Sequence, residues 1–187
     1  AGPGDETHHA WYPFQLAFLL LCLNGVSSSD HEDRKTLDLL WFPTGGGKTE
    51  AYLVVVAFTI FLRRLRLEDE GRGTTVLMRY SMRLLTAQQF ERAARMICAC
   101  EDIRKKGVHV LGETPISIGL YIGADGSPNH HRGTGDTTAN GLSTLKNGGT
   151  PEKGNPKQLH NCPWCGSQLK PADYNLVAKG PDGEERL

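Results

Sequence analysis

The sequence predicts an α/β fold in which a parallel sheet is flanked by helices and carries a phosphate-binding loop. The short apolar run Thr36–Phe42 leads directly into the glycines Gly45–Gly47, as a strand leads into a tight turn. A long helical pattern follows these glycines, and two further apolar runs alternate with a second helical pattern. Strands that alternate with long helices are typical of βαβ units, which place the strands parallel.

Length, charge and cysteine content set the outer limits. The 187 residues suffice for one domain with a core and a small appendage. Lys and Arg together number 21, as do Asp and Glu, so no global positive field attracts a polyanion and any nucleic-acid contact must be local. Five cysteines are an odd number, which favours a reducing, cytoplasmic compartment over a disulfide framework.

The first predicted element is a helix that begins at Pro13 and runs to Leu23. Its apolar part, Leu16–Leu23, is too short to span a bilayer. A signal peptide is the alternative interpretation, but the preceding residues include Asp5 and Glu6 and no Lys or Arg. We therefore favour a buried helix and predict no membrane contact.

Two longer helices and three strands are predicted after it. The helices are Thr49–Arg66, whose final arginines suit a helix C-terminus, and Met82–Lys106, which Gly107 ends. The predicted strands are Thr36–Phe42, Thr74–Tyr80 and Ile116–Ile122. The chain then divides into an N-terminal helix (1–26), the α/β lobe (27–123), a flexible insertion rich in Gly, Asn and Thr (124–160), and a cysteine-containing segment (161–187).

FPTGGGKT has the composition of a loop that binds a triphosphate. Backbone N–H groups of residues 45–48 can surround the phosphates, and the Lys48 ammonium can reach the outer ones. Thr49 offers its hydroxyl to Mg²⁺. Phe42 occupies the first glycine position of GxxxxGK[ST], which argues against a generic kinase or small GTPase. We predict ATP and Mg²⁺ as cofactors, with Lys48 and Thr49 as catalytic residues; a glycine turn that binds nothing is the alternative. The predicted cofactor-binding residues are Gln15, Thr44, Gly45, Gly46, Gly47, Lys48 and Thr49.

PTGGGKT resembles the corresponding loop of superfamily 2 helicases, and a second segment supports this resemblance. Those proteins carry a segment of the type TRALAxQ, and MRLLTAQ places Arg83, Leu85 and Gln88 on matching positions, with Met82 in place of the usual Thr. The resemblance implies a RecA-like lobe in which Arg83 and Gln88 contact the sugar-phosphate backbone. Arg79 is a weaker candidate for the same surface. A solvated helix face is the alternative interpretation.

Gln15, in YPFQLAF, resembles the glutamine that these helicases place before the loop to contact adenine. Its amide can both donate to and accept from the base, so it could select ATP among triphosphates. An ordinary helix-boundary residue is the alternative.

A longer combination of segments narrows the resemblance. The chain resembles the DrmA family, the helicase component of the DISARM anti-phage system, in four segments. These are LLWFPTGGGKTEAYL, LMRYSMRLLTAQQFERAA, PISIGLYIG with SPN, and CPWCG. This resemblance implies a bacterial ATPase that translocates on DNA, single-stranded or at a duplex end, with a DrmB-like partner subunit.

CPWCG has the form of half a zinc site, because Cys162 and Cys165 can present two thiolates to one ion and Gly166 lets the turn close. A redox pair and an unreactive pair are the alternatives. Further ligands are needed, and the local candidates are Cys98, Cys100, His130, His131 and His160.

No DExH or DExD motif follows an apolar strand, and no second lobe is recognisable. We hypothesise an N-terminal part of a larger helicase that alone hydrolyses little ATP. Two other classes stay open: a nucleotide-gated nucleic-acid-binding module without hydrolysis, and a P-loop nucleotide kinase, which would need an acceptor site and a lid that we do not find.

Overall fold

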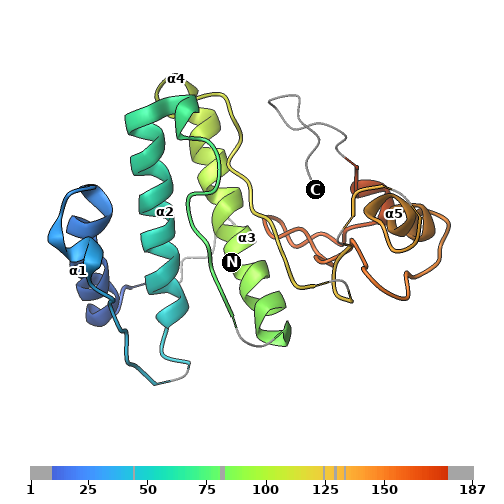
Figure 1. Cartoon of the computed structure of the whole chain (residues 1–187), viewed down its shortest axis with the longest axis horizontal. Helices are drawn as coiled ribbons and strands as arrows, with labels where there is room; N and C mark the ends of the chain where they lie inside the picture. The colour runs from blue at the N-terminus through green and yellow to red at the C-terminus, as the bar shows by residue number, and fades with distance from the viewer. Residues whose placement is uncertain are drawn as a thin grey trace. The chain divides into compact units, whose positions relative to one another are not determined.

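The computed structural model describes residues 10–43, 45–80, 83–123, 125–128, 130–132 and 134–176. The chain forms two compact units (Figure 1). Unit 1 comprises Ala1–Met78 and Ala99–Ile116, and unit 2 comprises Arg79–Cys98 and Ser117–Leu187. Helix α3 (Arg83–Lys106) contributes residues to both units.

Unit 1 begins with helix α1 (Pro13–Ser27), whose predicted start is confirmed. Pro13 occupies the first helical position, where its missing N–H costs no hydrogen bond. The Gln15 side chain accepts a hydrogen bond from the Tyr12 N–H at 2.8 Å, which caps the first turn. The helix continues four residues past the predicted end at Leu23.

Helix α2 (Lys48–Leu67) packs beside α1 and confirms the helix predicted after the glycines (Figure 1). The rings of Phe18 and Tyr52 meet edge to face, with centroids 5.7 Å apart. Near the end of α2, Arg66 donates to the Ser27 carbonyl at 2.6 Å and ties the helix to the end of α1. A short 3₁₀ turn, η1 (Glu32–Lys35), follows α1.

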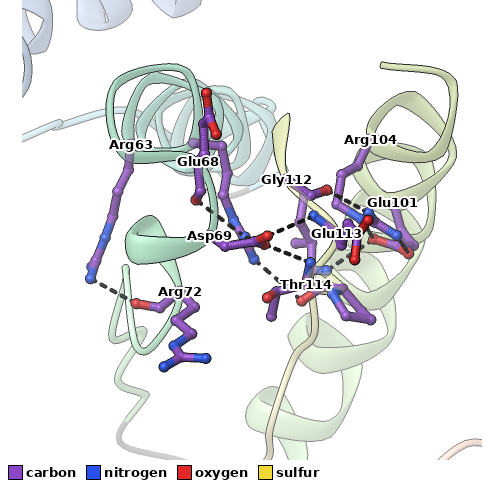
Figure 2. Close-up of polar contacts among 12 residues, drawn as sticks. Arg63, Glu68, Asp69, Arg72, Glu101, Arg104, Gly112, Glu113 and Thr114 are labelled. Atoms are coloured by element: carbon purple, nitrogen blue, oxygen red, sulfur yellow. Dashed lines mark hydrogen bonds and ion pairs between the residues drawn. The ribbon is translucent and has the colours of Figure 1, made fainter. Parts of the chain in front are cut away.

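The C-terminal end of α2 is joined to the segment after α3 by a polar cluster (Figure 2). Asp69, in the 3₁₀ turn η2 (Glu68–Gly71), accepts backbone N–H bonds from Glu113 at 3.1 Å and Thr114 at 2.7 Å. These bonds tie η2 to the chain just after the short helix α4 (Val108–Leu111). The Thr114 N–H, followed by that of Glu113, lowers the pKa of Asp69 to about 2.

A second part of this cluster lies on α3 itself. The guanidinium of Arg104 donates to both carboxylate oxygens of Glu101 at 2.7 Å and to the Gly112 carbonyl at 2.7 Å (Figure 2). Arg104 is buried, so this bidentate pairing satisfies a charge that burial would otherwise penalise. The buried apolar residues of unit 1 are Ala51, Ile60, Cys100, Leu111 and Ile116.

Unit 2 contains the start of α3, helix α5 (Thr138–Lys146) and the 3₁₀ turn η3 (Pro171–Asp173). The buried Thr137 hydroxyl accepts from the Asn140 N–H at 3.2 Å and caps α5. The stretch predicted to be a flexible insertion therefore contains a capped helix. The buried apolar residues of this unit are Ala93, Ala94, Ile97, Leu142 and Leu145.

The predicted parallel sheet, and with it the RecA-like α/β class, is wrong for the residues that the structure describes, because these form helices and turns and no strand. The run Thr36–Phe42 exposes its alternate side chains Leu37, Leu39 and Trp41, each more than four-fifths accessible. Leu77 and Tyr121, in the other two runs, are similarly exposed. An apolar run becomes a strand only where a second segment pairs with its backbone, and no such ladder forms here.

Within the described ranges, no helix is both long enough and apolar enough to cross a membrane.

Candidate functional site

The glycine loop lies between the apolar run at residues 36–42 and the N-terminus of α2. Gly45 and Gly47 have φ angles of 81° and 86°, in the left-handed region that glycine adopts without penalty. Between them, the Gly46 N–H donates to the Pro43 carbonyl at 3.3 Å. Gly47 is the N-cap of α2. The predicted contact residue Thr44 lies outside the described residues.

Lys48 is the first residue of α2, and its side chain turns back over the loop. Its ammonium donates to the carbonyls of Phe42 at 2.5 Å and Pro43 at 2.8 Å. Both partners are neutral carbonyls, so neither neutralises the positive charge of the ammonium. That charge can therefore attract an anion that approaches this end of the helix. Thr49 follows as the second residue of the helix and is half-buried. The helix N-terminus adds its own attraction for negative charge.

Gln15 lies against the same loop, although 32 positions separate it from Gly47. Its side-chain NH₂ donates to the Gly47 carbonyl at 2.9 Å, while its oxygen accepts from the Tyr12 N–H. Only 4 % of Gln15 is exposed. The structure thus brings Gln15, Lys48 and the glycines together, and it buries the glutamine amide against the loop backbone.

Aromatic residues next to Gln15 form a contact that the sequence analysis missed. The rings of Phe14 and Phe42 stack with centroids 3.9 Å apart and planes 19° apart, and Tyr12 stacks on Phe14 at 6.0 Å. The signal available in the sequence was the pair of aromatic–proline dipeptides, at Tyr12 and at Phe42, that precede the two helices.

The residues predicted to contact nucleic acid belong to unit 2. Arg79 and Gln88 are exposed. Arg83 begins α3, and its side chain lies outside the described residues, as does Met82. An exposed cation and an exposed amide before and within the first turns of a helix are compatible with a phosphate-backbone contact.

CPWCG forms a closed turn in unit 2. The Gly166 N–H donates to the Cys162 carbonyl at 2.8 Å, and the Cys162 N–H donates to the Ser167 carbonyl at 2.8 Å. Gly166 has a φ of 76°, which explains the glycine at this position. Arg95 of α3 donates to the Pro163 carbonyl at 3.2 Å and holds the turn against the helix.

One thiol of this turn, that of Cys165, and the thiol of Cys98 on α3 differ in surroundings. A hydrogen bond with the Ser167 side chain, aided by the Ser167 backbone and by Cys162, lowers the pKa of Cys165, which favours its thiolate. Burial, and then the charge of Cys162, raises the pKa of Cys98. Across the described part of the chain, no three His, Cys, Asp or Glu side chains are grouped closely enough to hold a metal ion. Cys162 and Cys165 therefore offer two ligands and not a complete site.

Comparison with known proteins identifies a relative in the DISARM defence system. The chain is 44 % identical over 165 residues to DISARM protein DrmA of Bacillus paralicheniformis (strain ATCC 9945a / NCIMB 11709 / CD-2). No family model matches the chain. No solved structure matches it either. The similarity covers 84 % of this chain but 14 % of the relative, so the chain spans a small part of that protein's length. Over most of its own length, the chain is therefore similar to a DISARM protein DrmA.

Proposed function

We propose that this chain holds the phosphates of Mg·ATP and forms the nucleotide-binding part of an ATP-dependent DNA helicase or translocase that acts in anti-phage defence in the bacterial cytoplasm. The observation that carries the proposal is the placement of Lys48 at the N-terminus of α2, after glycines in left-handed conformations, with its ammonium on two neutral carbonyls. The similarity to DISARM protein DrmA supports the defence role.

The residues present fit a triphosphate. The αL glycines let the backbone approach a ligand closely, and the first N–H groups of α2 have no partner within the helix. Lys48 would exchange its carbonyl partners for phosphate oxygens, which carry full charge and make stronger hydrogen bonds. Thr49 would hold Mg²⁺ through its hydroxyl, and the ion would neutralise charge on the phosphates.

Calorimetric titration of the chain with Mg·ATP tests this proposal. We expect saturable binding with one site, and loss of most of the affinity in Lys48→Ala. Lys35→Ala, which removes an exposed cation from η1, serves as the matched control and should bind normally. Equal binding by the wild-type chain and Lys48→Ala would contradict the proposal. A steady-state ATPase assay then separates a motor from a nucleotide-gated module without hydrolysis.

The DNA contact is proposed for Arg79, Arg83 and Gln88. We expect the chain to bind single-stranded DNA with an affinity that falls as salt rises, because phosphate contacts release counterions. Arg83→Ala should weaken DNA binding without changing Mg·ATP affinity. Unchanged DNA binding in this variant would contradict the assignment. We propose a DrmB-like subunit as protein partner, on the basis of the family resemblance alone.

We also propose that Cys162 and Cys165 supply two thiolates to Zn²⁺. The closed turn supports two ligands, and so does the Ser167 hydrogen bond that lowers the pKa of Cys165. The other ligands would come from outside the described residues. Metal analysis of protein purified without chelator tests this, with Cys162→Ser as the ligand variant and Cys22→Ser, in unit 1, as the control. Metal-free wild-type protein would contradict it.

A further inference from the structure

We infer that Gln15 is a positioning residue that aims a phosphate-binding N–H of the loop, so that it affects all triphosphates alike instead of selecting the adenine base. This inference rests on the proposed nucleotide site and assigns Gln15 a different part in it from base recognition.

Both polar groups of the Gln15 side chain make hydrogen bonds within the protein. Its NH₂ donates to Gly47 and its oxygen accepts from Tyr12, both at hydrogen-bonding distance, and 4 % of the residue is exposed. A glutamine that reads a base must offer its oxygen and its NH₂ on an open edge. In this chain both groups face protein backbone, and turning them toward a base would break two part-buried hydrogen bonds.

The partner of Gln15 explains what its hydrogen bond achieves. The carbonyl of Gly47 and the N–H of Lys48 belong to one planar peptide group and point in opposite directions. Gln15, by holding the carbonyl, therefore fixes the direction of the Lys48 N–H. That N–H belongs to the first residue of α2, so it lacks a partner within the helix and is a donor for an anion at the helix N-terminus.

A side chain at position 47 would displace the Gln15 amide from this contact. A Cβ built on Gly47 would lie 2.8 Å from the Gln15 nitrogen and 3.7 Å from both Glu50 and Tyr12. Phe14, the neighbour of Gln15, stacks on Phe42 at the opposite end of the loop. Successive residues of α1 thus brace both ends of the loop, one by stacking and one by a hydrogen bond.

Binding of three ligands distinguishes positioning from base recognition: Mg·ATP, Mg·GTP and inorganic tripolyphosphate with Mg²⁺. We expect Gln15→Leu to weaken all three by the same factor, about threefold to tenfold, as the loss of one hydrogen bond predicts. The ratio of ATP to GTP affinity should not change. Leu16→Ala, an exposed neighbour on the same helix, is the control and should bind like the wild-type chain.

Gln15→Glu adds a second measurement, the pH dependence of ligand affinity, which a general loss of structure would not produce. Its carboxylate can still accept from Tyr12 but places a second oxygen against the Gly47 carbonyl. When protonated, the acid can donate to that carbonyl again, and burial raises the pKa of a carboxyl group into a measurable range. Affinity relative to the wild-type chain should therefore recover as pH falls from about 8 to about 5.5 in Gln15→Glu, and not in Gln15→Leu.

The outcomes separate the two levels of the proposal. Weaker ATP binding with unchanged tripolyphosphate binding would show that Gln15 reads the base and would overturn this inference, as would unchanged binding of all three ligands. Absence of pH-dependent recovery in a folded Gln15→Glu chain would also overturn it. If the wild-type chain binds none of the three ligands, the nucleotide site itself fails.

Discussion

The two ends of α2 are stabilised in different ways. At the C-terminal end, Asp69 and the buried Arg104 are held by ionic and backbone partners in a network that links three segments of unit 1 (Figure 2). At the N-terminal end, the Lys48 ammonium rests on two neutral carbonyls. A buried charge that loses its counter-ion is costly, whereas an ammonium on carbonyls can exchange partners at small cost. We call the C-terminal end, with Asp69 and Arg104, the closed end, because its polar groups are held by strong partners. We call the N-terminal end, with Lys48, the open end, because its ammonium can accept a ligand.

The two ends of α2 also differ in which residues adopt positive φ angles. The loop end uses glycines at its positive φ angles, while the other end has Glu68 at φ 45°, the one residue other than glycine with positive φ among those described. Arg64 donates to the Glu68 carbonyl at 3.5 Å and is buried. The surrounding network therefore holds a strained residue in place, as is expected where packing determines the backbone.

The largest expected effect comes from breaking the closed end. Arg104→Ala removes the bidentate partner of the Glu101 carboxylate, which keeps its hydrogen bond from the Ile116 N–H, and the partner of the Gly112 carbonyl. We expect the variant to be destabilised by about 3 kcal/mol. Urea unfolding followed by circular dichroism measures the change. Lys106→Ala, which removes an exposed cation paired with Asp102 on the same helix, should cost less than about 0.5 kcal/mol. Equal effects of the two variants would contradict the contrast.

Lys48→Ala tests the open end. We expect Mg·ATP affinity to fall about tenfold to hundredfold, because charged hydrogen bonds to phosphate are lost. The free energy of unfolding should change little, since the ammonium contacts exposed carbonyls. Calorimetry and urea unfolding on the same protein provide both quantities. A large loss of stability with unchanged affinity would reverse the proposed difference between the ends.

Gly47→Ala combines backbone strain with a steric clash. A left-handed alanine costs about 1–2 kcal/mol, and its Cβ would meet Gln15 at 2.8 Å. Gly45→Ala is the matched control, because its φ is similar but no atom lies within 4 Å of its Cβ. The difference between the two unfolding free energies isolates the Gln15 contact; identical values would show that this contact contributes nothing.

Glu68→Gly should stabilise the folded chain, unlike the preceding variants. Glycine adopts φ 45° without strain, so we expect a gain of about 1 kcal/mol, reduced by the greater freedom of glycine in the unfolded chain. Thermal unfolding measures it, and Glu70→Gly in the same turn is the control. A lower melting temperature in Glu68→Gly than in the control would show that the conformation is not strained.

The smallest effect is a pH dependence confined to the closed end. The folded-state pKa of Asp69, about 2, lies below its ordinary value, so its contribution to stability is present above about pH 4 and is lost as pH falls toward 2. The Arg104 hydrogen bonds likewise lower the pKa of Glu101. Asp69→Asn should show a shallower loss of stability than wild type between pH 5 and about 2.5. Parallel plots of the free energy of unfolding against pH for the two proteins would exclude Asp69 as the source of the pH dependence.

Local patterns in the sequence were sufficient to locate α1, α2 and α3, but not α5, which lies in the stretch predicted to be a flexible insertion. Pro13 predicted the start of α1, the cations at the end of α2 suited its C-terminus, and Gly107 predicted the end of α3. The same kind of local pattern wrongly predicted three strands, which the described residues do not form. Their apolar runs indicate an extended segment, but a strand exists only when another segment pairs with it, and pairing is a property of the whole fold.

The sequence by itself therefore determined α1, α2, α3 and the glycine loop, because propensity, capping and left-handed glycines act over a few residues. Tertiary structure decided the rest. It showed that the predicted strands do not pair in the described residues, and it set the partners of Gln15, because a buried amide bonds to whichever backbone groups the packing of α1 on the loop brings near.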